Sequence, residues 1–232
     1  MTHPLISTAL FGSLCVLSAC SQSSGISSKI DEVYSGTFAI LDNLVRDDLL
    51  RCGVNQDEFN RLLSLPENKF DQDFEGGWRA TTYKEACNNA AAEMIKAYIL
   101  YSEPKPAKNQ NILRWHAGQT KAAAGNYDEA ISLFKGTYEP DQDRGIAWNL
   151  YVDATLAFLQ NDREALTLTH DTLAKLTVSE EEKANRRKFL KDNPNITMSE
   201  GFVDNPNNLA PVKSLLRCFG QPYSVAYGRY EK

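Results

Sequence analysis

The sequence predicts an all-α fold in which neighbouring helices pack as antiparallel hairpins. Three observations support this prediction. Apolar residues recur every three or four positions along most of the chain, which is the period of one helix face. Pro, Gly and Asn interrupt the pattern at intervals that suit helices. A segment in the middle of the chain is repeated one hairpin length further on. With 232 residues, 42% of them hydrophobic, the chain can bury a substantial core.

The N-terminal region predicts two helices in succession. Segment 29–52 has an amphipathic pattern of apolar residues at helical spacing, and Gly53 is a plausible stop. Asn55 and Glu58 then form a capping box for a short helix, which Pro66 ends.

The next segment predicts a loop followed by a longer helix. Residues 67–80 carry aromatic side chains without helical period, so we expect an ordered loop held by those rings. Thr82 and Glu85 are expected to cap a helix unusually rich in Ala, whose small side chains let a neighbouring helix approach closely. Pro104 and Pro106 end this helix and mark an internal boundary.

The stretch from 109 to 134 predicts one complete helical hairpin. A helix over 109–124 is followed by a turn at Gly125, and Asn126 with Glu129 is expected to cap the second helix. Small and aromatic residues at fixed positions resemble the tetratricopeptide repeat family: Gly118, Gly125, Tyr127, Asp128, Glu129, Ala130, Ile131 and Phe134. Two positions depart from that family, because Trp115 lies one residue later than its usual aromatic and Lys121 replaces a common aromatic.

A second copy of the motif follows. Residues 160–166 parallel residues 125–131, and Ala165 follows Ala130 at close to the family's period of about 34 residues. The preceding helix, 146–159, is apolar on much of its circumference, which favours a sandwiched position. Two hairpins are too few to be stable alone, so the flanking helices are expected to act as caps.

The C-terminal region predicts two further helices. Ser179 and Glu182 form a capping box for the first, residues 193–208 form a loop, and Pro211 begins a helix that Gly220 stops. The tyrosine-rich tail is expected to pack back on the body. The resemblance to the repeat family implies a right-handed, tetratricopeptide-like solenoid of two hairpins with non-repeat helical caps. The chain as a whole also resembles a group of tetratricopeptide proteins from Gram-negative bacteria.

The first twenty residues indicate export. An apolar run from Leu5 ends in Leu17-Ser18-Ala19-Cys20, which resembles the lipobox of bacterial lipoprotein signal peptides. We therefore expect cleavage before a lipidated Cys20. Ser21 in the next position favours the outer membrane, facing the periplasm. The usual Lys or Arg before the apolar run is missing, so ordinary secretion and a retained anchor remain alternatives. The expected segments are the signal peptide (1–19), the lipidated tether (20–28), the N-terminal cap (29–104), the two hairpins (105–177) and the C-terminal cap (178–232).

Three cysteines remain in the folded part of the chain. In an oxidising periplasm Cys52 and Cys87 are the favoured disulfide pair. Three buried thiols, or a pairing through Cys218, are the alternatives.

Several function classes lack their sequence signals. The net charge is −5 and no long basic run occurs, so we do not expect nucleic-acid binding. The chain has no Walker loop, GxSxG or GxGxxG motif, and His116 and His170 have no metal-ligand partners at a recognised spacing. We expect no cofactor, no metal and no catalytic residue.

A binding groove is the stronger functional reading. In the tetratricopeptide family the first helix of each repeat lines the concave face, and this register places Trp115, His116, Gln119, Leu150 and Phe158 in the groove. The alternative is that the aromatic residues are core between the repeats. The expected function is a protein–protein interaction module that binds an envelope protein or peptide. Alternatives are an immunity protein against a toxin, an assembly or pilotin factor, and a cell-wall-modifying hydrolase.

Overall fold

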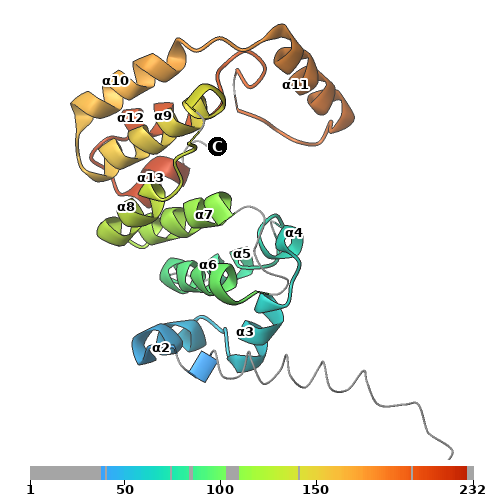
Figure 1. Ribbon diagram of the computed structural model, residues 1–232, viewed down its shortest axis with the longest axis vertical. Coiled ribbons are helices and arrows are strands. Elements are labelled where there is room, and N and C mark those ends of the chain that lie inside the picture. Colours follow the sequence, from blue (N-terminus) through green and yellow to red (C-terminus); the bar gives the residue numbers. More distant parts are fainter. Residues whose placement is uncertain are drawn as a thin grey trace, which may run out of the picture.

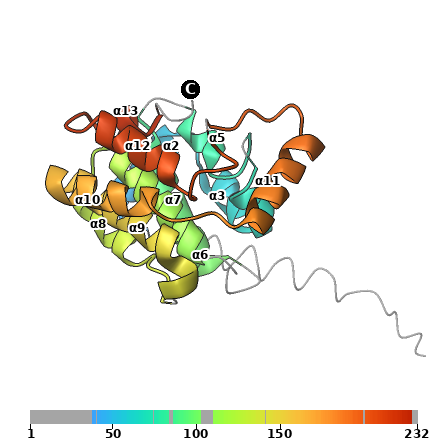
Figure 2. The ribbon, with the colours of Figure 1, turned by 90° about the horizontal axis from the view of Figure 1, so that it is seen from above.

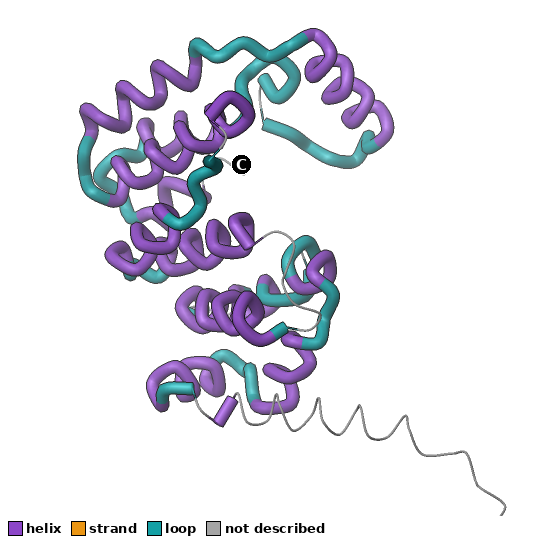
Figure 3. The backbone as a smooth tube through the Cα atoms, in the orientation of Figure 1, coloured by secondary structure: helices purple, strands orange, loops and turns teal. Residues whose placement is uncertain are grey.

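The computed structural model describes residues 38–39, 41–73, 75–83, 86–102, 110–140, 142–199 and 201–228. The regular elements in this part of the chain are α-helices, and these residues contain no β-strand. Figure 3 shows the helices in purple, joined by teal loops. The all-α prediction is therefore confirmed. None of the described helices combines the length and the apolar character that a membrane crossing requires.

From α2 to α10 the helices run along the long axis of the molecule, and α12 and α13 turn back toward α9 and α7 (Figure 1). The N-terminal end is made of α2 (Asn43–Arg51), α3 (Gln56–Leu63), α4 (Glu67–Phe70), α5 (Arg79–Thr82) and α6 (Asn88–Tyr101). The remainder is made of α7 (Gln110–Ala123), α8 (Tyr127–Lys135), α9 (Gln142–Leu159), α10 (Arg163–Ala174), α11 (Glu180–Asp192), α12 (Leu209–Arg217) and α13 (Tyr223–Gly228).

Two hydrophobic cores lie on either side of α7. Leu113 and Ala117 belong to a first core built around α6, whereas Trp115 and Ala122 belong to a second core built around α9. Positions 113 and 115 point to opposite sides of a helix with 3.6 residues per turn, so one helix can serve both cores. Helix α7 is thus sandwiched in the middle of the molecule, between the N-terminal and C-terminal helices.

The two predicted hairpins are present as packed helix pairs, α7 with α8 and α9 with α10. At the first pair, a Cβ added to Gly118 would lie 2.7 Å from Cε1 of Phe134, so only glycine permits this approach. Gly125 makes the turn with a φ of +82°, a conformation that glycine adopts without strain. The close contact expected at Gly118 and the turn expected at Gly125 are confirmed.

The capping predictions had mixed outcomes. Asn55 accepts a hydrogen bond from the N–H of Glu58 (2.9 Å), and Ser179 accepts one from the N–H of Glu182 (3.1 Å), as predicted. The predicted cap at Thr82 is wrong, because Thr82 ends α5 and the long helix begins only at Asn88.

Residues 67–80 are more ordered than a loop. They hold the short helix α4 and the start of α5. Two of the predicted aromatic anchors are buried: Phe70 stacks on Tyr98 with ring centroids 3.7 Å apart, and Trp78 is also buried. The third, Phe74, lies outside the described residues. Gly77, at a φ of +55°, has no room for a side chain, because a Cβ there would lie 2.0 Å from the carbonyl oxygen of Phe70. The prediction that buried aromatic side chains anchor this segment is correct. The short helices within it were not predicted.

The C-terminal tail packs back on the body, as predicted. Tyr223 in α13 is buried, and its backbone N–H donates to the hydroxyl of Tyr127 in α8 (3.1 Å). Helix α11 stands to one side of the other C-terminal helices in Figures 1 and 2. Arg186 holds it there, since the buried guanidinium donates to the carbonyl oxygens of Phe202 (2.8 Å) and Asn205 (2.7 Å).

Candidate functional site

The residues predicted to line a groove are largely core residues. Trp115 is only 2% exposed, and its ring lies against Phe134 (4.5 Å between centroids), Trp148 (4.8 Å) and Tyr151 (4.5 Å). The prediction that Trp115 contacts a partner is therefore wrong, and the alternative of aromatic packing between the hairpins is correct. The reason is that side chains of α9, Trp148 and Tyr151, cover the Trp115 ring on the face of α7 that was expected to be open.

Phe158 and Leu150 belong to the same core. Phe158 is buried and meets the rings of Phe219 and Tyr223 edge-on, with centroids 6.1 Å apart in both cases. Leu150 is half-buried and packs against this core. The groove assignment of Phe158 is also wrong, because the C-terminal helices α12 and α13 cover it. Gln119 is half-buried, and its role stays a prediction.

His116 connects α7 to the segment between α4 and α5. Its Nδ1 lies 2.7 Å from Oδ1 of Asp71, a fully buried carboxylate that also accepts a hydrogen bond from Nε1 of Trp78 (2.8 Å). Burial alone would raise the pKa of Asp71, but these hydrogen bonds and the nearby Arg79 outweigh it and hold the pKa below its ordinary value. This cluster is a structural link between helices, so the expected groove contact of His116 gains no support.

A cleft of about 540 Å³ lies elsewhere, between α2 and the turn that joins α7 to α8. We call it the α2–α8 cleft. Its walls come from four helices and one turn: Leu44 and Val45 of α2, Asn89 and Glu93 of α6, Lys121 of α7, Gly125 and Asn126 of the turn, and Tyr127, Asp128 and Glu129 of α8. Its volume is within the range of ligand-binding pockets.

The floor of the cleft is a buried ammonium group. The side chain of Lys121 is 4% exposed, and its Nζ donates to Oδ1 of Asn89 (2.7 Å), Oε1 of Glu93 (2.5 Å) and Oε2 of Glu129 (2.8 Å). An ammonium has three N–H donors, so each has a partner here. These hydrogen bonds offset the free-energy cost of burying the Lys121 ammonium, and they hold the carboxylates of Glu93 and Glu129 in place.

Lys96 on α6 completes the network. Its Nζ lies 2.7 Å from Oε1 of Glu129 and 3.1 Å from Glu93. Burial alone would raise the pKa of Glu129, but hydrogen bonds from Lys121 and Lys96 outweigh it, so the pKa lies below its ordinary value. Burial alone would lower the pKa of Lys96, and its bonds to Glu129 and Glu93 raise it instead. Both groups are thus held in their charged forms.

Asn126 occupies the N-cap position of α8, but the prediction that its side chain caps the helix is wrong. Its side chain makes no capping bond to α8 and instead donates to Oδ1 of Asn89 across the cleft (3.0 Å). Asn89 is thereby a junction, because it contacts both Lys121 and Asn126 through one oxygen. The hydrogen bond to Asn89 on another helix thus replaces the local capping bond that the sequence predicted.

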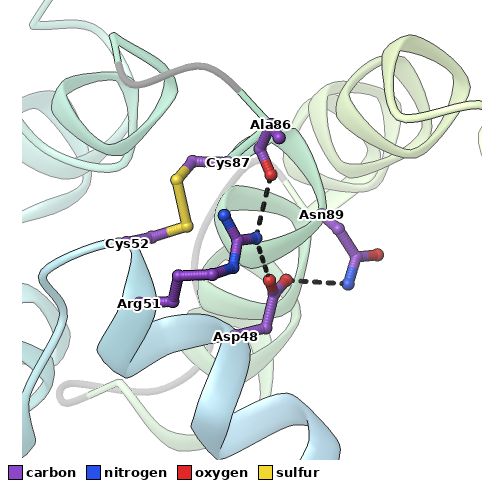
Figure 4. The surroundings of a disulfide bond; sticks show 6 residues. All are labelled: Asp48, Arg51, Cys52, Ala86, Cys87 and Asn89. Atoms are coloured by element: carbon purple, nitrogen blue, oxygen red, sulfur yellow. Dashed lines mark hydrogen bonds and ion pairs between the residues drawn. A yellow bond between two sulfur atoms is a disulfide. The ribbon is translucent and has the colours of Figure 1, made fainter.

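A disulfide fixes the opposite wall of the cleft. Cys52 at the end of α2 and Cys87 at the start of α6 are bonded, with their Cα atoms 5.7 Å apart, which is the favoured pairing (Figure 4). Beside it, the Arg51 guanidinium pairs with Asp48 and donates to the carbonyl oxygen of Ala86 (3.1 Å), while Asn89 donates to Asp48 (3.0 Å). These contacts join α2 to the floor of the cleft. Cys218 is a buried thiol outside the disulfide.

Comparison with known proteins finds no family model, curated protein or solved structure that matches the chain.

Sequence reasoning missed the residues that build this cleft. One signal could have found them: Lys121 is a charged residue at a position where the repeat pattern usually has an aromatic, flanked by apolar residues on both sides of the helix. A lysine in such a position needs carboxylate partners from neighbouring helices. Within the described ranges, no group of three or more His, Cys, Asp or Glu side chains is arranged to hold a metal ion.

Proposed function

We propose that this chain is a lipid-anchored, tetratricopeptide-like interaction module of the bacterial envelope, and that it binds a segment of a partner protein in the α2–α8 cleft. The observation that carries this proposal is the cleft itself, a volume of about 540 Å³ whose polar side chains are held by each other and by a disulfide-linked helix. Side chains that are ordered before binding lose little conformational entropy when a ligand arrives, which favours affinity.

The tetratricopeptide-like arrangement is supported by the two packed hairpins, α7 with α8 and α9 with α10. Gly118 and Phe134 meet where the family's repeat pattern places a close helix contact. The partner site differs from the one that the family register implies, because α9 and the C-terminal helices fill that face. The cleft is instead formed where the first hairpin meets the N-terminal helices.

Lipid anchoring rests on the sequence around Cys20, which lies outside the described residues, as does the tether from Ser21 to Ser28. Each buried acyl CH₂ contributes about 0.8 kcal/mol, so two or three chains on Cys20 give a stable anchor. We expect the wild-type protein in the membrane fraction and the Cys20→Ser variant in the soluble periplasmic fraction. Cys15→Ser, which changes a cysteine inside the signal peptide, is the matched control and should stay with the membrane. Equal fractionation of all three proteins would contradict the anchor.

Partner binding in the cleft is tested by site-specific photo-crosslinking in cells. Leu44 is 80% exposed on the wall of the cleft, and Leu168 on α10 is 68% exposed and far from it in sequence and in fold. A photoreactive residue at position 44 should give a covalent adduct of defined mass. The same residue at position 168 should not. The absence of an adduct from position 44, or identical adducts from positions 44 and 168, would contradict partner binding in this cleft.

A further inference from the structure

Building on the proposed function, we propose that the α2–α8 cleft binds a basic side chain, Arg or Lys, of the partner segment. The cleft is lined by three carboxylates, Glu93, Asp128 and Glu129, and by one ammonium, that of Lys121. Beside these charges lies an apolar wall. This combination fits a long aliphatic side chain that ends in a cation.

An anionic ligand is disfavoured because the cleft offers it no available cation. The three donors of Lys121 are directed at Asn89, Glu93 and Glu129, and the side chain is almost completely buried. Lys96, which is not among the lining residues, is bonded to the carboxylates of Glu93 and Glu129. A phosphate or carboxylate would have to displace one of these partners and leave a buried charge unpaired.

A cation, in contrast, finds acceptors that are open. Asp128 is exposed, and its carboxylate makes no hydrogen bond or ion pair with the side chain of another described residue. The side chain of Glu129 is 41% exposed, and each of its oxygens accepts a bond from only one lysine, so both keep accepting capacity. The two residues are neighbours on α8. A guanidinium or ammonium in the cleft can reach one or both of them without breaking the Lys121 network.

Two of the cleft carboxylates, Asp128 and Glu129, lie at the N-terminal end of a helix. Both lie in the first turn of α8, where the positive end of the helix dipole stabilises negative side chains. Hydrogen bonds from Lys121 and Lys96 outweigh the effect of burial and keep the pKa of Glu129 below its ordinary value. The net charge of the cleft lining is therefore negative at neutral pH.

The aliphatic part of a basic side chain also has a place to pack. Leu44 and Val45 form the α2 wall of the cleft, and Leu44 is exposed to solvent. Arg and Lys bury their methylene stems along apolar surface while their charged ends contact polar groups. A purely apolar side chain would use only the α2 wall, and a short acidic side chain would use neither feature, because the carboxylates repel it.

The test uses the detergent-solubilised, full mature protein and three synthetic peptides that carry an uncharged fluorophore. Their central residue is Arg, its neutral isostere citrulline, or Glu, each flanked by Ala-Leu and Leu-Ala with blocked ends. Fluorescence anisotropy should show the Arg peptide binding about three- to fivefold tighter than the citrulline peptide, which is the upper part of the range for one partly exposed ion pair. The Glu peptide should bind more weakly than both. Raising the salt concentration should reduce the difference.

Two asparagine variants locate the effect. Asp128→Asn should lower the affinity for the Arg peptide about threefold and leave the citrulline peptide unaffected. Asp57→Asn is a matched control, because Asp57 is an exposed residue in the first turn of α3 and is not part of the cleft. It should change neither affinity. The inference is overturned if Arg and citrulline peptides bind alike, if the Glu peptide binds best, if no peptide binds, or if Asp57→Asn has the same effect as Asp128→Asn. The crosslink from position 44 decides the proposed function separately.

Discussion

Replacing both Cys52 and Cys87 with alanine is expected to lower the free energy of unfolding by about 4 kcal/mol. The disulfide closes a loop with a sequence separation of 35 residues, and its loss restores the conformational freedom of that loop in the unfolded chain. For a domain of this size, such a change lowers the melting temperature by roughly 10 °C. Urea denaturation and thermal unfolding of the variant and of the oxidised wild-type protein measure the effect.

The loss should be concentrated at one end of the molecule. Helix α2 packs on α6, and its covalent link to that helix is the disulfide. Hydrogen exchange of the α2 amides is therefore expected to accelerate more than exchange in α9, which lies in the second core. Cys218→Ala, which changes the buried thiol of α12's C-cap, is the control and should leave the exchange of α2 as in the wild type. A double variant within about 1 kcal/mol of the wild type would show that this loop needs no covalent constraint.

Trp115→Ala is expected to destabilise the protein by about 4 kcal/mol, since large-to-small changes at buried aromatic residues typically cost 3–5 kcal/mol. The indole is surrounded by three other rings, so its removal leaves a cavity at the centre of the second core. Urea denaturation with intrinsic Trp78 and Trp148 fluorescence can follow unfolding in the variant.

Gln119→Ala provides the matched comparison for Trp115→Ala. It lies one turn further along α7 and is half-buried, so its substitution should cost less than about 1 kcal/mol. Trp115→Phe should retain part of the ring contacts and lie between the two. A Trp115→Ala protein that keeps wild-type stability would refute the core assignment.

Local signals in the sequence predicted the local structure well. The capping residues Asn55 and Ser179, and the turn at Gly125, act within a few residues of their own position, so no tertiary knowledge is needed to interpret them. Gly118 was also predictable, because the repeat pattern states which helix position lies against its neighbour. The helix class and the hairpin pairing followed from such positions.

Features that depend on distant parts of the chain were not predictable in the same way. Asn126 has the right residue type and spacing for an N-cap, yet its side chain bonds to Asn89, which is remote in sequence. Trp115 was expected in a groove because the repeat register does not say which face α9, α12 and α13 will cover. The α2–α8 cleft needs α2, α6, α7 and α8 together, so only Lys121, out of place in its apolar surroundings, hinted at it.

The burial of the disulfide has a consequence for its exchange with other thiols. Both cysteines are almost fully enclosed by the first core, so a thiol or an oxidoreductase cannot reach the sulfur atoms of the folded chain. Exchange proceeds through direct attack of a thiolate on a sulfur, which requires access. The disulfide therefore has to form before α2 packs on α6. In the folded protein it is protected from reduction and exchange until α2 detaches from α6.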